Sequence, residues 1–333
     1  MIILIAILSF IILPAHIFAN TVPIKRTELL MGTVVNISVF DERHVDAVSD
    51  AFDRLTELDD LLSINKEDTL ISYVNSCSGE RPVAVPTDIY KLIDKSLYYS
   101  RITDGLFDVT IAPLTNLWRI GFEDAQVPDA DAIEQTLPLI GYENILLEQV
   151  QSTVFLTKEN MALDLGSIAK GYACDEVARI LDKQGVKKAL IDIGGNVYVI
   201  GSSKVGLQHP FQDRGIPFAA LNLTNKSVVT SGIYERFLEV DGVMYHHLLN
   251  PDTGYPFENE LASVTIISNI STDGDALSTG VFAKGLEDGM AFVENINGIE
   301  AIFVTTDYKI YISSGIGHDF EVVDPQFALY SNH

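Results

Sequence analysis

A central helix followed at once by two closely spaced strands constrains the fold more than any other part of the chain. Ile168–Gly185 carries apolar residues at helical spacing and predicts an amphipathic helix. Ala189–Ile193 is predicted to form a buried strand and Val197–Ile200 another. A pair of glycines, Gly194 and Gly195, stands between these strands. Such a pair indicates a β-bulge or a close approach of the backbone by a ligand.

The same mixture of strands and helices extends over the rest of the chain. Gly32–Phe40 predicts a strand and Val45–Leu62 a helix, and a further helix is expected over Thr87–Thr103 with Thr87 as its cap. Another helix is expected from about Gly274. Further strands are expected at Met161–Asp164, Ala219–Leu223, Leu238–Val240, Ser263–Ser268, Ala301–Thr305 and Ile310–Ser313. With no repeat and no linker rich in Gly, Pro or Ser, the prediction is one compact α+β domain with mixed or antiparallel sheets and interspersed helices.

The first nineteen residues differ from the rest. Met1–Leu13 is almost entirely apolar, too short for a membrane span, and is followed by a small residue at Ala19. Residues 1–19 therefore predict a signal peptide, and residues 20–333 the functional domain, exported to the periplasm or the extracytoplasmic face of the membrane. No Lys or Arg precedes the apolar run, so an uncleaved anchor is the alternative.

Charge and cysteine content exclude several classes of function. The net charge of −24 disfavours nucleic acid as a partner, because phosphate backbones are bound by an excess of Lys and Arg. An anionic ligand would need a metal ion or main-chain N–H groups to offset this field. Cys77 and Cys174 have neither the number for a disulfide framework nor the spacing for a zinc site, so both are predicted to be small buried residues.

Two segments near the C-terminus carry side chains suited to phosphate chemistry. His247 precedes a turn that ends at Gly254, and Asp275 precedes Thr279 by one helical turn. A carboxylate and a hydroxyl on one helix face suit Mg²⁺ that carries a phosphorylated ligand. His247 can act as an acid or base near neutral pH. The alternatives are a structural histidine, Asp275 as a helix cap and Thr279 bonded to a carbonyl one turn earlier.

A third segment, Asp164–Gly171, could bind an anion. A strand that leads through Gly166 and Ser167 into a helix offers free main-chain N–H groups, and Lys170 could add a positive charge. The alternative is that Asp164 caps the helix and Lys170 is solvated.

Read together, these segments resemble the ApbE family of FAD:protein FMN transferases. The resemblance runs from about Glu28 to Phe320 and rests on blocks that occur in the family's order. The blocks are Met31-Gly32-Thr33, Asp104–Trp118, Asp164–Asp175, Asp192–Gly201, Val229–Tyr234 with His247–Pro256, and Asp275–Gly280.

The resemblance implies a substrate, a metal and a reaction. FAD would bind as substrate, and Mg²⁺ would be held by Asp275, Thr279 and the main-chain oxygen of Ser167. FMN would be transferred to a threonine or serine hydroxyl of an acceptor flavoprotein, such as a membrane redox subunit, with release of AMP. His247 would act as the base toward that hydroxyl. The positions expected to contact FAD are Met31, Asn65, Leu106, Phe107, Asp108, Asp164, Lys170 and the Leu248-Leu249 segment.

The chain departs from the family pattern at two positions. Asn65 stands where many members have a tyrosine that stacks on the flavin, and stacking of this kind is worth about 1–3 kcal/mol. Loss of the aromatic ring makes FAD hydrolysis to FMN and AMP an alternative activity. A further alternative is that the protein binds flavin without catalysing a reaction. The other departure is His209, where the family often has an acidic residue.

Overall fold

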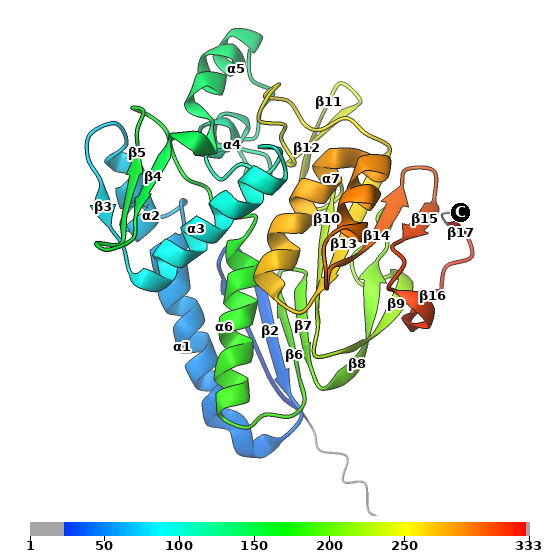
Figure 1. Ribbon diagram of the computed structural model, residues 1–333. Helices are drawn as coiled ribbons and strands as arrows, with labels where there is room; N and C mark the ends of the chain where they lie inside the picture. The colour runs from blue at the N-terminus through cyan, green and yellow to red at the C-terminus, as the bar shows by residue number, and fades with distance from the viewer. Residues whose placement is uncertain (1–22, 331–333) are drawn as a thin grey trace, which may run out of the picture.

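A nine-stranded sheet forms the centre of the protein (Figure 1). The computed structural model describes residues 23–330, and the strands of this sheet follow the order β1-β2-β6-β7-β10-β13-β14-β15-β17. Every neighbouring pair is antiparallel except β15 and β17, which are parallel. The strands are β1 (Ile24–Leu30), β2 (Thr33–Val39), β6 (Ala189–Ile193), β7 (Asn196–Ile200), β10 (Ser227–Gly232), β13 (Leu261–Ser268), β14 (Glu300–Thr305), β15 (Lys309–Ile312) and β17 (Ala328–Tyr330).

Helices cover one face of this sheet (Figure 1). α1 has the predicted bounds, and its regularly spaced residues Val48, Phe52 and Leu55 are buried in the main core. The glycine at Gly285 leaves the helical conformation and divides α7 into two pieces. The helices of this layer are α1 (Val45–Leu62), α3 (Thr87–Ile102), α6 (Ala169–Lys183) and α7 (Ser271–Glu294).

A small three-stranded sheet covers part of the opposite face. It has the order β16-β9-β8, and its buried Phe218 and Leu221 pack with Val228 and Ile302 of the large sheet. Strand β13 therefore has apolar layers on both sides, and all of its residues are buried. The bounds of the small sheet are β8 (Ser202–Gln208), β9 (Pro217–Thr224) and β16 (Phe320–Val322).

The remaining elements are short helices, strands and 3₁₀ turns that connect the parts described above. Among them, β11 and β12 form a separate two-stranded hairpin. They are α2 (Leu70–Ser76), α4 (Ala112–Trp118), α5 (Ala130–Thr136), β3 (Val83–Ala84), β4 (Ile145–Glu148), β5 (Thr153–Leu156), β11 (Phe237–Val240), β12 (Val243–His246) and the short 3₁₀ turns η1 (Glu42–His44), η2 (Leu137–Leu139), η3 (Tyr142–Asn144) and η4 (Gly317–Asp319).

Three sequence-based expectations about secondary structure are wrong. Residues 161–164 are extended but form no strand, because the Asn75 side chain takes up both main-chain groups of Leu163 (2.7 and 3.0 Å). Pro86, and not Thr87, occupies the cap position of α3. Helix α7 begins at Ser271, earlier than expected, so Asp275 lies inside it and is not its cap.

The prediction of one α+β domain with mixed and antiparallel sheets is confirmed. Within residues 23–330, no helix is both long and apolar enough to span a bilayer. The predicted leader, residues 1–19, lies outside the described residues.

Candidate active site

One cavity of about 950 Å³ brings together all of the residues predicted to bind FAD or Mg²⁺ or to act as the base. Its size falls in the range of pockets that enclose small organic ligands, roughly 300–1,000 Å³. The predicted residues that line it are Met31, Asn65, Leu106, Phe107, Asp108, Asp164, Ser167, Lys170, His247, Leu248, Leu249, Asp275 and Thr279. Segments far apart in the chain therefore meet at one site.

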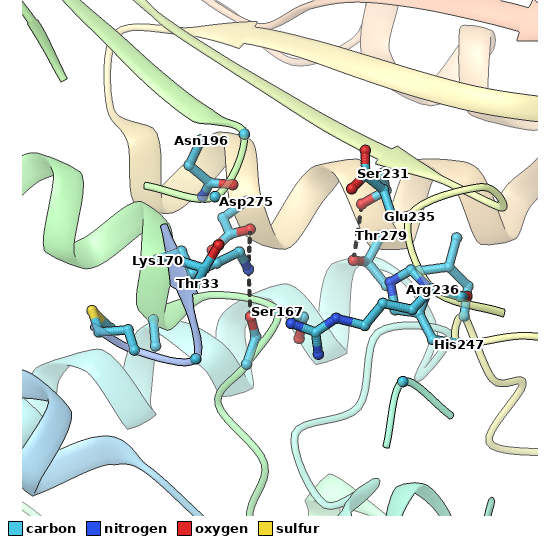
Figure 2. Close-up of a pocket in the computed structure, with 18 of the residues that line it drawn as sticks. Thr33, Ser167, Lys170, Asn196, Ser231, Glu235, Arg236, His247, Asp275 and Thr279 are labelled. Carbon is cyan, nitrogen blue, oxygen red and sulfur yellow. Dashed lines mark hydrogen bonds and ion pairs between the residues drawn. The ribbon is translucent and has the colours of Figure 1, made fainter. Parts of the chain in front are cut away.

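One side of the cavity rests on the large sheet and on α6 and α7. We call it the anchored wall and define it by Asp164, Ser167, Lys170, the Gly194–Asn196 turn, Asp275 and Thr279. The opposite side is held by the β11–β12 hairpin. We call it the hairpin wall and define it by Arg236, His247, Leu248 and Leu249. Figure 2 shows Asp275 and Lys170 on one side of the cavity and His247 on the other.

Asp275 links the two helices of the anchored wall. Its Oδ2 accepts a hydrogen bond from the main-chain N–H of Gly171 (2.8 Å), and its Oδ1 lies 3.3 Å from Lys170 Nζ. Lys170 Nζ also donates to the carbonyl oxygen of Gly166 (2.6 Å). The Asp275 side chain is only 5% exposed, so this carboxylate is fixed in position by groups of α6. The alternative interpretation of Lys170 as a freely solvated residue is wrong.

Thr279 lies one turn after Asp275, and both line the cavity as the helical spacing predicts. The Thr279 Oγ1 atom lies 3.4 Å from Ser231 Oγ, which in turn lies 2.8 Å from Ser278 Oγ. Ser278, and not Thr279, bonds back to the Asp275 carbonyl oxygen (2.8 Å). Asp275 and Thr279 thus present a carboxylate and a hydroxyl to the same space.

Asp164 shapes the turn that leads into α6. Its Oδ1 accepts from the main-chain N–H of Gly166 (2.8 Å), and its Oδ2 accepts from Thr115 Oγ1 (3.3 Å). Its own N–H donates to the carbonyl oxygen of Val109 (2.8 Å). The Asp164 carboxylate therefore ties the turn containing Ser167 to α4, and the Asp164 main chain ties it to the segment before α4.

The Gly194–Asn196 turn contributes a buried donor whose function the sequence did not specify. Asn196 is 2% exposed and lines the cavity, yet its Nδ2 has no hydrogen-bond partner. A buried amide left unpaired costs about 1–3 kcal/mol, so this atom is suited to a polar ligand atom. The turn is wedged in place, because a Cβ on Gly194 would lie 2.3 Å from Thr33 Oγ1. The glycine pair thus marks a close approach between chain segments beside the cavity.

His247 has a defined tautomer in the hairpin wall. Its Nδ1 lies 3.2 Å from the carbonyl oxygen of Arg236, and its main-chain N–H donates to the same oxygen (3.1 Å). Because a carbonyl oxygen only accepts, Nδ1 carries the proton and Nε2 keeps a free lone pair. Removal from water and the Arg236 guanidinium hold the pKa of His247 well below its usual value, at about 3. His247 is therefore neutral at pH 7 and able to accept a proton.

The turn after His247 is fastened to the block that ends at Trp118. Trp118 is fully buried, and its Nε1 donates to the carbonyl oxygen of Gly254 (2.8 Å). Its ring also lies near Tyr245 and Tyr255. This contact explains how the Asp104–Trp118 block and the His247–Pro256 block come to line one cavity.

The floor and the rim of the cavity carry the other predicted residues. Asp108 accepts hydrogen bonds from Thr110 and from the Tyr142 N–H, and burial raises its pKa. Phe107 is almost fully buried, whereas Asn65 is exposed at the rim. Met31 has a left-handed backbone (φ 53°) in the turn between β1 and β2.

The N-terminus of α7 is not available to an anionic ligand. The Asp175 carboxylate accepts the main-chain N–H groups of Ser271 and Thr272 (2.7 and 2.8 Å) and also the Thr272 hydroxyl (2.5 Å). The first N–H groups of this helix are therefore already taken up and none is left for a phosphate. Asp275 and Thr279 lie farther along the helix.

His209 plays a structural part away from the cavity. It is 1% exposed, its Nδ1 accepts from the Phe211 N–H (2.9 Å), and its ring packs against Phe327. Asp324 Oδ2 lies 3.5 Å from its Nε2. The histidine that departs from the family pattern thus joins the loop after β8 to the segment before β17. Cys77 and Cys174 are likewise buried, as predicted, and both are free thiols.

Protein side chains alone would not complete the coordination of a metal ion at this site. Within residues 23–330, no group of three or more His, Cys, Asp or Glu side chains lies close enough together to hold a metal. Asp275 and Thr279 supply two hard oxygens, and Mg²⁺ commonly completes its coordination with water and ligand phosphate. The donor set is consistent with Mg²⁺ bound together with a phosphorylated ligand, and not with a metal held by protein alone.

Fold and site together define an α+β protein with a large cavity that joins oxygen ligands and a lysine on one side to a neutral histidine on the other. Residues 31–303 match the ApbE family. An FAD:protein FMN transferase of Klebsiella pneumoniae (strain 342) is 41% identical over 287 residues, which cover 86% of this chain and 90% of the relative. An FAD:protein FMN transferase of Treponema pallidum (strain Nichols) is 33% identical, and the match covers 92% of this chain and 91% of the relative.

Solved structures of ApbE proteins have the same fold as this chain. An ApbE protein of Thermotoga maritima superposes with a TM-score of 0.81 at 30% identity and covers 88% of this chain and 97% of its own. The flavin transferase ApbE of Vibrio cholerae superposes with a TM-score of 0.78 at 27% identity, and the match covers 88% of this chain and 98% of the Vibrio chain. The chain belongs to the ApbE family, and the resemblance noted in its sequence is confirmed.

Asn196 and Arg236 are among the cavity residues that the sequence reasoning did not single out. Asn196 lies in a recognised block, and its polar side chain directly after two glycines was the available signal. Arg236 lies just after a recognised block, and no local pattern distinguishes it from the other exposed arginines.

Proposed function

We propose that this protein is a transferase that moves FMN from FAD to a threonine or serine hydroxyl of an acceptor flavoprotein, releases AMP and requires Mg²⁺. Flavin transfer itself follows from family membership and from relatives named FAD:protein FMN transferase. One observation carries the finer proposal. A neutral histidine with a free Nε2 shares a cavity with Asp275, Thr279 and Lys170.

The residues of the anchored wall would bind the pyrophosphate. Lys170 would exchange part of its contact with Asp275 for a phosphate oxygen, and Asn196 Nδ2 would donate to another polar atom of FAD. Asp275, Thr279 and the main-chain oxygen of Ser167 would hold Mg²⁺, which supplies charge neutralisation on the pyrophosphate when bound. Leu106, Phe107, Leu248 and Leu249 supply apolar surface for the rings of FAD.

The hairpin wall would activate the acceptor. His247 Nε2 would take the proton of the acceptor hydroxyl as its oxygen forms a bond to the FMN phosphorus. The bridging P–O bond breaks, and its electron pair leaves on the phosphate of AMP. The Arg236 carbonyl oxygen keeps the imidazole oriented during this transfer, because it holds the Nδ1 proton.

FAD hydrolysis is the second candidate activity. Asn65 is exposed at the cavity rim, where an aromatic residue would cover the flavin. Water could then take the place of the acceptor hydroxyl with the same base and the same bound pyrophosphate. A flavin-binding protein without turnover is the remaining alternative.

One experiment separates the three activities. The protein is incubated with FAD and Mg²⁺, with and without a candidate acceptor, while AMP, FMN and acceptor mass are followed. Transfer predicts AMP together with FMN covalently bound to the acceptor. Hydrolysis predicts free FMN and AMP without an acceptor, and simple binding predicts intact FAD.

Asp275→Ala should reduce both AMP release and acceptor labelling at least about 100-fold, because a metal and phosphate site loses its carboxylate. The matched control is Asp273→Ala, which removes a carboxylate of the same helix that does not line the cavity. Unchanged products in Asp275→Ala would rule out the proposed metal site.

We also propose that the protein is exported and acts on a redox flavoprotein at the extracytoplasmic face of a membrane. The apolar leader-like sequence of residues 1–19 supports export. N-terminal sequencing of the protein from intact cells, combined with protease accessibility in spheroplasts, tests both cleavage and location.

A further inference from the structure

Arg236 differs from every other cation that lines the cavity. Lys66 pairs with Asp59 and Asp60, Arg119 with Asp124, Lys170 with Asp275 and Arg214 with Glu235. Among residues 23–330, no carboxylate lies within ion-pair distance of the Arg236 guanidinium. The acids of the lining each have a partner as well, including Asp108, Asp164 and Asp192. In a chain of net charge −24, an arginine without an acidic partner inside a cavity is suited to an anionic ligand.

The backbone provides space for the Arg236 side chain to cross the cavity. Gly121 has a left-handed conformation (φ 95°), and a Cβ at this position would lie 2.9 Å from Arg236 Cδ. The arginine stem therefore passes directly over a glycine. Figure 2 shows the guanidinium extending from the side of His247 toward Ser167 in the anchored wall.

Arg236 is also joined to His247 through its main chain. Its carbonyl oxygen receives both the main-chain N–H and the Nδ1 proton of His247 (3.1 and 3.2 Å). The base and the guanidinium are thus held next to each other at the foot of the β11–β12 hairpin. A proton acceptor and a cation placed together in this way are suited to nucleophilic attack on a phosphate. The proton acceptor can deprotonate the attacking hydroxyl, and the cation can neutralise charge on the phosphate oxygens.

We propose that Arg236 is a catalytic residue whose guanidinium binds a non-bridging oxygen of the phosphate that is transferred. The proposal rests on the proposed function and adds a group to it. As the acceptor oxygen bonds to the FMN phosphorus, its proton passes to His247 Nε2. The bridging bond breaks and AMP carries away the electron pair. Charge that builds on the non-bridging oxygens is neutralised by the guanidinium, as planar two-pronged donors do in phosphoryl transfer.

The test compares Arg236→Met and Arg236→Lys with the matched control Arg214→Met. Arg214 also lines the cavity, but it is ion-paired with Glu235 and its side chain is 80% exposed. Arg236→Met should lower kcat for AMP release about 100- to 1,000-fold, the usual cost of losing one donor to the transition state. Arg236→Lys should recover part of this loss, and Arg214→Met should stay within about threefold of the unaltered protein.

Loss of the guanidinium near His247 should also change the pH dependence of activity. Removal of the guanidinium should move the acidic limb of the activity profile toward higher pH, because Arg236 helps to hold the pKa of His247 down, after desolvation. The other charged or titratable groups that act on His247 are His246 and Lys170, and both are retained in Arg236→Met. An unmoved limb together with a kcat within threefold of the unaltered protein would overturn the proposal.

A binding measurement keeps this inference separate from the proposed function. The ratio of the affinities for FMN and for riboflavin isolates the contribution of the phosphate and requires no turnover. This ratio should fall about tenfold or more in Arg236→Met and remain unchanged in Arg214→Met. If the unaltered protein neither transfers nor hydrolyses FAD, the proposed function fails. An equal ratio in Arg236→Met and the unaltered protein refutes the role of Arg236.

Discussion

The two walls of the cavity are supported in different ways. The anchored wall rests on the nine-stranded sheet and on α6 and α7, and its Asp275 is 3% exposed. The hairpin wall is carried by the two-stranded β11–β12 hairpin, where Phe237 and Val243 are 48% and 50% exposed. A two-stranded hairpin has little stability of its own and depends on packing at its base, here on Trp118.

The difference separates two tasks. Groups fixed in the core can bind a pyrophosphate without further rearrangement, which is what electrostatic catalysis requires. Groups on an exposed hairpin can adjust to an incoming protein chain. We therefore expect loss of the base in the hairpin wall to alter turnover with little change in FAD binding, and changes that disturb the packing of the anchored wall to alter stability.

The largest effect is expected for His247→Gln. Loss of the proton acceptor should lower kcat for acceptor labelling about 100-fold or more, while the dissociation constant of FAD changes less than about threefold. Rapid-mixing kinetics and fluorescence titration measure the two quantities. The remote His44→Gln serves as the control, since His44 lies outside the cavity lining. A loss of FAD affinity as large as the loss of kcat would remove the division of tasks between the walls.

A smaller effect, on the free energy of unfolding, is expected when a glycine is replaced by alanine in the anchored wall and in the hairpin that carries the other wall. Gly194 and Gly242 both have left-handed backbones (φ 58° and 79°), but only a Cβ on Gly194 meets a neighbour, Thr33 Oγ1 at 2.3 Å. Gly194→Ala should lower the free energy of unfolding by about 2–4 kcal/mol, from overpacking and backbone strain. Gly242→Ala, in the hairpin turn, should lower it by about 1 kcal/mol. Denaturant titration of both variants measures the difference, and equal losses would mean that the walls are equally rigid.

A further effect concerns stability at low pH, where only part of it develops before the protein reaches strongly acidic conditions. The pKa of His247 is lowered on folding to about 3, so below its unfolded pKa of about 6.5 the unfolded chain binds a proton that the folded chain does not. This group should therefore destabilise the fold increasingly as the pH falls from about 6.5 toward 3, and have no effect above about 6.5. Thermal unfolding of the unaltered protein should show a steeper loss over this range than His247→Gln. Parallel curves would indicate that the imidazole is protonated in the folded state.

Much of the fold follows from local pattern in the sequence. The spacing of Val48, Phe52 and Leu55 gave the bounds of α1, because one apolar stripe on a helix is buried against the sheet. The apolar segment Ala189–Ile193 likewise gave β6, because its alternate residues are buried in the core. The pattern failed at residues 161–164, where the Asn75 side chain replaces a neighbouring strand as hydrogen-bond partner. That partner lies far away in the chain and carries no local signal.

For the candidate site, the sequence by itself determined which residues are suited to phosphate chemistry and that Asp275 and Thr279 share a helix face. Only the tertiary structure decided which of them have free atoms to offer. Asp175 occupies the helix terminus, the Arg236 carbonyl oxygen fixes the tautomer of His247, and Asn196 Nδ2 remains without a partner. The physical reason is that residue type and spacing determine the chemistry of which a side chain is capable. Hydrogen bonds and ion pairs between distant segments determine which of its donor and acceptor atoms remain available to a ligand.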